Sequence, residues 1–115
     1  MGWGTVELEP EVAEWLHSLS HEEFERVAFY LDLLEERGPL LDEPYTRQLR
    51  GKLRELRFYL GPDRQRVTYY IAPGRRIILL TVFRKTARRE RSEIERAFAA
   101  MERCLAEEHT SHGEE

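Results

Sequence analysis

Basic side chains are concentrated in the middle of this 115-residue sequence, in a pattern that could bind an anion. Residues 47–91 hold 14 Lys and Arg against three Asp and Glu, a net charge of +11, while the rest of the chain carries a net −15. Such a block is typical of one anion-binding face with acidic helices away from it. The alternative is a solvated surface whose charges pair across helices and strands. The concentration of the block favours anion binding.

Two arginines of this block, Arg57 and Arg66, fall on one face of a predicted β-hairpin. If Pro62 and Asp63 are the loop residues, Arg57 and Arg66 are diagonal neighbours, with Cβ atoms about 7–8 Å apart or less. Guanidinium groups this close repel each other unless a phosphate or a carboxylate lies between them. Glu55 shares their face and could neutralise one of them. A phosphate-binding cup is nevertheless favoured over a structural ion-pair network, because one acid serves several bases.

Two tyrosines are predicted on the same face. In this register Tyr59 lies opposite Arg66, and a second loop at Pro73-Gly74 places Arg66 opposite Thr81. Tyr59 and Tyr70 could stack on an unpaired base, as in proteins that bind single-stranded RNA. The alternative is that both tyrosines cover a second apolar face beneath a helix.

Three β-strands rich in Tyr, Ile, Val and Phe are predicted to position these side chains. They span Leu53–Leu60, Arg64–Ala72 and Arg76–Lys85. The connections at residues 61–64 and 72–75 each have Pro at the second turn position, so both are predicted to be tight antiparallel hairpins. The alternating side chains that should face the core are Leu56, Phe58, Val67 and Tyr69.

Amphipathic helices are predicted before and after these strands. Trp3–Glu9 is expected to form a short strand, and Pro10 then suits the first turn of a helix. A second helix begins at Ser20, which can form a capping box with Glu23, and ends at Arg37-Gly38-Pro39. The apolar stripes are Val12, Trp15, Leu16 and Leu19 in the first helix, Phe24, Val27, Ala28, Leu31 and Leu34 in the second, and Ile94, Ala97, Phe98, Met101 and Leu105 in a third, Glu90–Glu108.

Together these elements predict one domain over residues 1–115, with 109–115 as a disordered polar tail. The expected fold is α+β, with an antiparallel sheet of three to four strands, an N-terminal helical hairpin and a C-terminal helix. The longest apolar run, Ile77–Phe83, is too short to cross a bilayer, and the N-terminus lacks the pattern of a secretory signal. With a single cysteine, Cys104, these features indicate a cytoplasmic protein.

Four segments occur in a characteristic order: Leu49–Phe58, Arg66–Tyr70, Gly74–Thr86 and Glu93–Ala97. This ordered set resembles the RelE/HigB/ParE superfamily of bacterial toxins, most closely the HigB-like branch of type II toxin–antitoxin systems, over residues 8–105. The resemblance implies a RelE-like fold and an mRNA interferase, an endoribonuclease that cuts messenger RNA on the ribosome. In that reaction a 2′-hydroxyl attacks the adjacent phosphate, with no metal and no cofactor.

The resemblance also implies roles for individual residues. Arg57 and Arg66 match positions whose cations stabilise the phosphate, and Lys52 and Lys85 match basic positions that grip RNA or transfer protons. Tyr59 joins these catalytic candidates on cross-strand geometry alone. The other side chains expected to bind RNA are Arg50, Arg54, Arg64, Tyr70, Arg84, Arg88 and Arg89.

The implied partners are a helix-turn-helix antitoxin, the ribosome with its mRNA, and operator DNA reached only through the antitoxin; no membrane is expected. No histidine lies between His21 and His109, so a lysine or a tyrosine must transfer protons unless the tail histidines fold back. The alternative function is a non-nucleolytic toxin of the ParE type, which poisons DNA gyrase. A further alternative is an inactive relative that acts only in antitoxin and operator binding.

Overall fold

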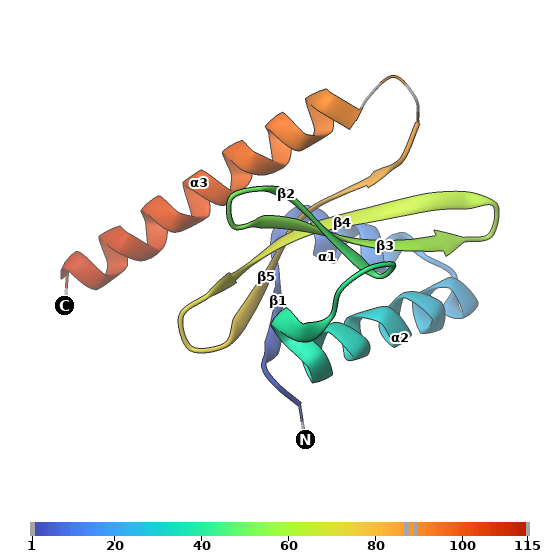
Figure 1. Ribbon diagram of the computed structural model, residues 1–115, viewed down its shortest axis with the longest axis horizontal. Coiled ribbons are helices and arrows are strands. Elements are labelled where there is room, and N and C mark those ends of the chain that lie inside the picture. The colour runs from blue at the N-terminus through green and yellow to red at the C-terminus, as the bar shows by residue number, and fades with distance from the viewer. Residues whose placement is uncertain (1, 87, 89, 115) are drawn as a thin grey trace.

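The computed structural model describes residues 2–86, 88 and 90–114, with side chains as far as Glu108. Its elements follow one another as β1 (Thr5–Leu8), α1 (Pro10–Ser18), α2 (His21–Arg37), a 3₁₀ turn η1 (Gly38–Leu40), β2 (Thr46–Arg50), β3 (Leu53–Leu60), β4 (Asp63–Ala72), β5 (Arg76–Arg84) and α3 (Glu90–Glu114) (Figure 1). The fold is therefore α+β, as predicted. Helix α3 continues six residues past the predicted end at Glu108, so the described backbone of the predicted tail is helical as far as Glu114.

The sheet has five strands in the order β1-β5-β4-β3-β2, one or two more than predicted. β1 pairs with β5 in parallel and the other neighbours are antiparallel, so the sheet is mixed rather than antiparallel. The strand missed by the prediction is β2, whose sequence TRQLR is mostly exposed and lacks apolar alternation. It forms one edge of the sheet, which leaves β3, β4 and β5 in the interior.

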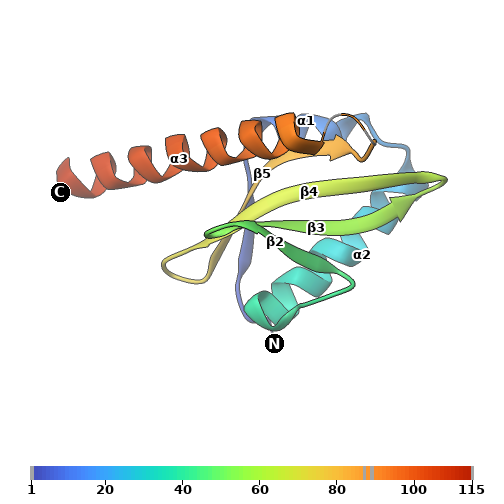
Figure 2. The same ribbon diagram turned by 45° about the horizontal axis from the view of Figure 1, so that its top comes forward.

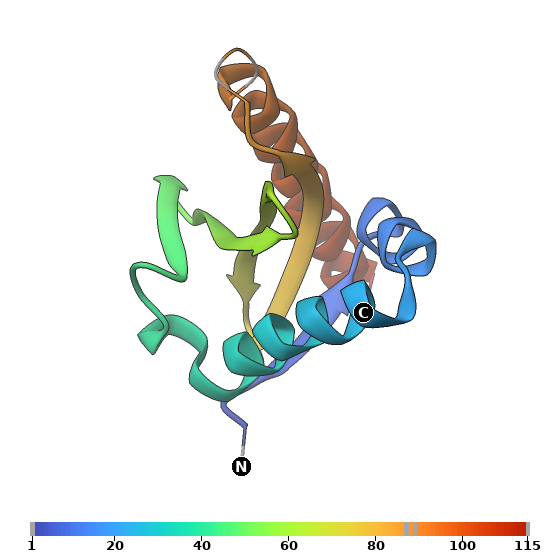
Figure 3. The same cartoon turned by 90° about the vertical axis from the view of Figure 1, so that its right-hand side faces the viewer.

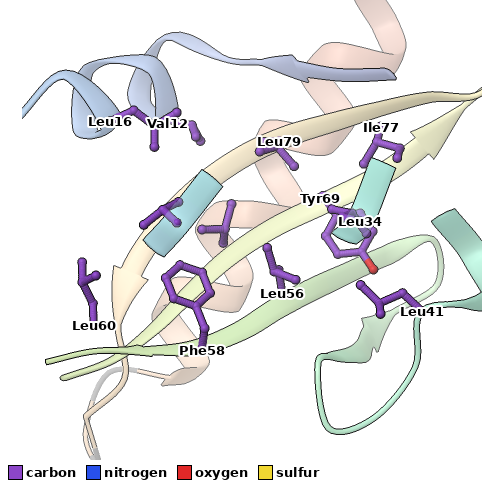
Figure 4. Close-up of a cluster of buried hydrophobic side chains, with 12 residues drawn as sticks. Val12, Leu16, Leu34, Leu41, Leu56, Phe58, Leu60, Tyr69, Ile77 and Leu79 are labelled. Carbon is purple, nitrogen blue, oxygen red and sulfur yellow. The ribbon is translucent and has the colours of Figure 1, made fainter. Parts of the chain in front are cut away.

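Helices cover the two faces of the sheet from opposite sides, as Figures 2 and 3 show for α2 and α3. The first core lies between the sheet and both N-terminal helices, and its side chains are seen in Figure 4. The second core lies under α3 and includes Leu53, Tyr70 and Met101. The prediction of an N-terminal helical hairpin needs one correction. Each of the two helices packs mainly against the sheet, α1 on β5 and α2 on β3.

Local sequence signals define where α2 begins and ends. The Ser20 hydroxyl accepts a hydrogen bond from the Glu23 amide at 3.2 Å, and the Glu23 carboxylate accepts one from the Ser20 amide at 2.9 Å, so the predicted capping box is confirmed. Gly38 ends the helix with φ +51°, and a Cβ at this position would lie 2.3 Å from the Trp3 ring. The prediction that Phe24 faces the core is wrong, because its side chain is 46% exposed near the start of the helix.

The first hairpin is tighter than predicted. Leu60 pairs with Asp63 around a Gly61-Pro62 loop, and Arg57 lies directly opposite Arg66. The predicted register is therefore wrong by two residues. Because side chains alternate with a period of two, this shift leaves every side chain on its predicted face and brings the two arginines closer together.

The second hairpin also differs from the prediction. Ala72 pairs with Arg76 across a three-residue loop, Pro73–Arg75, in which Arg75 itself has φ +57°. An irregularity in the middle of the β4–β5 pair then places Thr68, rather than Arg66, opposite Thr81. Thr68 pairs with Thr81 and the next residue, Tyr69, pairs with Leu79, so β5 has one extra residue here. Such a β-bulge increases the local twist of the strands.

No helix among the described residues combines the length and the apolar character needed to cross a membrane.

Candidate nucleic-acid interface

Arg57 and Arg66 lie side by side on the face of the sheet that α3 covers farther along. The Arg57 amide donates a hydrogen bond to the carbonyl of Tyr45 at 2.8 Å, on the side of β3 away from β4. Arg57 and Arg66 therefore form a non-hydrogen-bonded cross-strand pair, in which Cα atoms approach to about 4.5 Å and side chains are closest. The strand pairing alone forces the two guanidinium groups into one small region.

Glu55 lies next to both arginines on the same face of β3. Its Oε2 atom is 3.7 Å from the Nε atoms of both Arg57 and Arg66. The side chains of Glu55 and Arg66 are only 1% and 4% exposed, whereas that of Arg57 is 27% exposed. We refer to Glu55, Arg57 and Arg66 as the arginine cluster.

Four polar atoms of the arginine cluster are buried without a hydrogen bond. Both carboxylate oxygens of Glu55 and the Nε atoms of Arg57 and Arg66 have no hydrogen-bond partner among the described residues. The 3.7 Å separations give charge attraction without a hydrogen bond. Buried groups of this kind are rare in folded proteins and require an explanation, such as a bound ion or a chemical role.

Burial outweighs charge pairing in the arginine cluster. Burial raises the pKa of the Glu55 carboxyl, against the opposing effects of Arg66 and Arg57. Burial likewise lowers the pKa of the Arg66 guanidinium, against the opposing effect of Glu55. Both shifts disfavour the charged form and have the same cause, the loss of water. Since an arginine remains protonated at neutral pH, the cluster is a desolvated cationic site.

Two threonines close the site on the side nearer the α3 core. Thr68 and Thr81 face each other from β4 and β5 with their Oγ1 atoms 2.5 Å apart, and the Thr81 amide donates to Thr68 Oγ1 at 3.1 Å. Both threonines are buried, and Thr68 lies opposite Glu55 across the β3–β4 pair. This row satisfies its own hydrogen bonds and separates the arginine cluster from the apolar side chains beneath α3.

Arg47 is a neighbour of the arginine cluster that sequence reasoning did not select. It pairs with Glu55 across β2 and β3. Its positive charge opposes the rise in the pKa of Glu55 that burial causes. It was missed because β2 was not predicted. Glu55 was recognised only as a neutralising charge, although an acidic residue at alternate spacing from Arg57 was the signal that could have found it. At the start of α3, Glu90 acts on Glu55 in the opposite direction and raises its pKa.

The open end of the same face carries three further predicted residues. Tyr59 lies opposite Arg64, rather than opposite Arg66, and its ring is 60% exposed. The Lys85 amide donates to the Arg64 carbonyl at 2.8 Å, which continues the pairing one residue beyond β5. Tyr59, Arg64 and Lys85 thus form a row next to Arg57 and Arg66, and the structure brings all five together.

Other predicted residues are not at this site. Lys52 is exposed in the β2–β3 turn, and five residues of extended strand place its Cα about 16 Å from that of Arg57. Arg50 binds Glu95 at 3.0 Å and lies over the Phe98 ring at 4.8 Å, so it attaches β2 to α3.

The opposite face of the sheet holds two further predicted arginines. Arg54 donates to Thr46 Oγ1 at 3.0 Å and to the Tyr69 hydroxyl at 3.4 Å, on the side of the first core. Arg84 lies beside Asp63 at 3.7 Å. Residues that alternate with Arg57 and Arg66 necessarily project from the other face, so neither arginine can share their ligand directly.

Tyr70 is fully buried beneath α3. It therefore covers an apolar face, as in the alternative given above, and its ring cannot stack on RNA. Burial raises the pKa of its hydroxyl well above the usual range.

Arg88 is exposed between β5 and α3, and Arg89 lies outside the described residues. Within the described part of the chain, no group of three or more His, Cys, Asp or Glu could hold a metal ion.

Comparison with known proteins adds to this geometry. Residues 14–102 match the family described as phage-derived protein Gp49-like. The chain is 31% identical over 93 residues to a curated Mycobacterium tuberculosis protein named "Putative toxin HigB2"; the match covers 76% of this chain but only 45% of that protein's length.

Two solved structures are also similar. The archaeal RelE–RelB complex from Pyrococcus horikoshii OT3 aligns with a TM-score of 0.57 and 25% identity, covering 73% of this chain and 97% of that chain. A mutant of the E. coli toxin RelE in the free state aligns with a TM-score of 0.60 over 90% of this chain and 98% of that one. At 17% identity, the second likeness concerns the fold alone.

Proposed function

The chain belongs to the phage-derived Gp49-like family, of the RelE/HigB type, and from this membership we propose that it is the toxin of a type II toxin–antitoxin system. We propose further that it is an endoribonuclease, which cleaves messenger RNA on the ribosome without a metal or another cofactor. The HigB2 relative and the archaeal RelE–RelB complex support the first part. The arginine cluster supports the second.

The observation that carries the nuclease proposal is the set of unsatisfied atoms in the arginine cluster. Two Nε–H donors and two carboxylate oxygens are buried together, with Glu55 Oε2 3.7 Å from each Nε atom. A phosphate at this site would be attracted by the charges of Arg57 and Arg66, of which the guanidinium of Arg57, 27% exposed, is the more accessible. The Glu55 carboxylate would then lie beside the nucleotide that carries this phosphate.

This arrangement suits an attack by a 2′-hydroxyl on the adjacent phosphorus. Glu55 accepts the proton of the 2′-hydroxyl as its oxygen forms a bond to phosphorus. Arg57 and Arg66 stabilise the negative charge that accumulates on the phosphate oxygens. The bond from phosphorus to the 5′-oxygen breaks, and this oxygen takes up a proton from Lys85 or Tyr59. The products are a 2′,3′-cyclic phosphate and a 5′-hydroxyl end.

The raised pKa of Glu55 is favourable for this role. A general base is most effective when its pKa lies near the working pH, because it then combines basicity with an adequate unprotonated fraction. An exposed glutamate is a weaker base than this. Burial raises the pKa of Glu55 and therefore makes it a stronger base. The charges of the nearby arginines oppose this rise and so favour the ionised carboxylate.

The partners follow from the same premise. The RelE–RelB complex supports a protein antitoxin as the partner of this cytoplasmic toxin. The net +11 of residues 47–91 would attract acidic antitoxin segments, and the same charge would attract ribosomal RNA and mRNA. Operator DNA is reached only through the antitoxin. Arg64 and Lys85, with Tyr59 in the same row, extend the cationic surface from the scissile phosphate along the strand, and Lys52, Arg88 and Arg89 stay proposed RNA contacts.

Mapping of RNA ends tests this proposal. The purified chain is added to ribosomes stalled on a defined message, and new 5′ ends are located by primer extension. We expect ends within the decoding site that are absent with naked RNA and with Arg66→Ala. An intact message at stoichiometric protein contradicts the nuclease proposal for that message and directs attention to DNA gyrase.

A further inference from the structure

An exposed aromatic ring lies on the outer side of α2, across the sheet from the arginine cluster. α2 and α3 cover opposite faces of the sheet (Figure 3), and the arginine cluster is on the face that α3 covers. α2 buries Val27 and Leu34 against the sheet, whereas Phe29 is 61% exposed. A single exposed ring is common in folded proteins, so its surroundings decide whether it binds anything.

Carboxylates surround this ring at helical spacing. Residues three and four positions apart are neighbours on the surface of a helix, and residues seven apart lie on the same face two turns away. Phe29 has an acidic residue at four of these positions, and all four acids are exposed. Arg26 is the only basic residue within four positions of it. The ring and the four acids, which we call the Phe29 face, are Phe29, Glu22, Glu25, Asp32 and Glu36.

The ring of Phe29 is held from one side and open to solvent on the other. It makes an edge-to-face contact with Tyr30, with ring centroids 5.2 Å apart and an interplanar angle of 89°. Tyr30 in turn stacks on Phe58 of the first core, with centroids 5.0 Å apart and an angle of 15°. The ring is therefore positioned before any partner arrives, which lowers the entropy cost of binding to it.

We propose that the Phe29 face holds a basic segment of a ribosomal protein, with one arginine or lysine over the ring between Glu25 and Asp32. The inference rests on the proposed function, because it takes the ribosome as the place where the protein acts. A cation over an aromatic ring is attracted by the negative face of the ring, and carboxylates beside it add attraction of opposite charges. Glu25 lies 3.0 Å from His21 Nε2, an exposed contact that a second cation can share, because a carboxylate accepts several hydrogen bonds.

Charge decides which component of the ribosome fits this face. Ribosomal RNA presents phosphates, which the four carboxylates repel, whereas the proteins that bind this RNA present lysines and arginines. An acidic antitoxin segment is repelled as well and is attracted instead to residues 47–91, with their net +11. Because α2 lies across the sheet from the arginine cluster, a protein bound to the Phe29 face leaves the cluster open to the message. The contact therefore orients the toxin on the ribosome.

Photocrosslinking identifies what touches this face. Benzoylphenylalanine replaces Phe29 in the full chain, and the protein is irradiated on ribosomes stalled on the defined message. The matched control carries the same group in place of Phe24, which is 46% exposed and projects from a different side of α2. We expect position 29 to crosslink to a basic segment of a ribosomal protein, and this product to be absent from position 24. Crosslinks from position 29 to ribosomal RNA alone, to a second copy of the chain or to no ribosomal component overturn the inference.

Cleavage kinetics measure what the contact contributes. A cation over an exposed ring is worth about three- to fivefold in affinity. We expect Phe29→Ala to raise the KM for stalled ribosomes by about this factor with kcat unchanged, while Phe29→Tyr, which keeps the ring, and Phe24→Ala behave as the wild type. An unchanged KM in Phe29→Ala, or an equal rise in Phe24→Ala, overturns the inference.

Further outcomes separate failure of this contact from failure of the proposed function. A message that is cut normally without the crosslink overturns the contact and leaves the nuclease proposal standing. The crosslink on ribosomes whose message stays intact supports the contact and contradicts the nuclease. Fluorescence anisotropy with a labelled single-stranded RNA hexamer should give equal affinity for the wild type and Phe29→Ala, and a loss there assigns the ring to RNA and overturns the contact. If the protein neither binds ribosomes nor cuts the message, both are overturned.

Discussion

Arg66→Met separates the charge of the buried arginine from its packing. Methionine retains much of the aliphatic volume of the side chain but leaves Glu55 with Arg57 as its nearest cation in the arginine cluster. The pKa of Glu55 is already raised by burial, and without Arg66 the folded state is expected to hold Glu55 in its protonated form. The penalty for removing Arg66 then becomes a penalty for protonation, which depends on pH.

The size of this penalty has an upper bound. Protonating a carboxyl group whose pKa is 4.5 in the unfolded chain costs about 3.4 kcal/mol at pH 7 and about 0.7 kcal/mol at pH 5, at about 1.36 kcal/mol per pH unit. We therefore expect Arg66→Met to lose up to about 3 kcal/mol of stability at pH 7 and less than about 1 kcal/mol at pH 5. The sign follows from the raised pKa of Glu55: its contribution to stability is complete below the unfolded pKa and is lost as pH rises through the folded pKa.

Urea unfolding followed by the fluorescence of Trp3 and Trp15 measures the effect at both pH values. Arg64→Met is the matched control, because this exposed arginine lies on the same strand, and it should change stability by less than about 0.5 kcal/mol. A loss in Arg66→Met that is equal at pH 5 and pH 7 would contradict a role for Glu55 protonation, since the cost would then come from packing. A gain in stability at pH 7 would refute it equally.

Three further predictions concern the same chain. Glu55→Gln should lower single-turnover cleavage about 100-fold or more and abolish the decline in rate that the wild type shows as pH falls through the raised pKa of Glu55; an unchanged acid limb would exclude Glu55 as the base. Leu34→Ala should cost about 3 kcal/mol in urea unfolding, because this side chain is fully buried in the first core, and a cost below about 1 kcal/mol would contradict its assigned place. Ser20→Ala should cost about 1 kcal/mol through loss of the capping box, while Ser18→Ala, which is outside the box, serves as its control.

Regular alternation made the centre of the sheet predictable. The three long strands, the capping box at Ser20 and the end of α2 at Gly38 follow from signals within a few residues of one another. Alternation also placed Glu55, Arg57 and Arg66 on one face, and this survived a register error of two residues. Local periodicity and turn chemistry determine such features, so sequence is sufficient for them.

Features that depend on distant partners were not predictable. β2 has no apolar alternation and is defined by its pairing with β3. Arg54 and Tyr70 were assigned to RNA because their residue types suit it, yet one binds Thr46 and Tyr69 and the other is covered by α3. The hollow at the edge of β3 is lined by Tyr30, Tyr45 and Tyr59, which come from separate elements, and no local pattern encodes their approach.

In the proposed reaction a 2′-hydroxyl, deprotonated at Glu55, attacks a phosphate held by Arg57 and Arg66. The most direct measurement is single-turnover cleavage of a ribosome-bound message that carries one 2′-deoxynucleotide immediately 5′ to the mapped cut, beside an all-ribose control. We expect cleavage of the control, with a 2′,3′-cyclic phosphate on the upstream product, and no cleavage at the substituted position. Cleavage of the 2′-deoxy message at the same site and rate would contradict it, because the attacking group would then have to come from elsewhere.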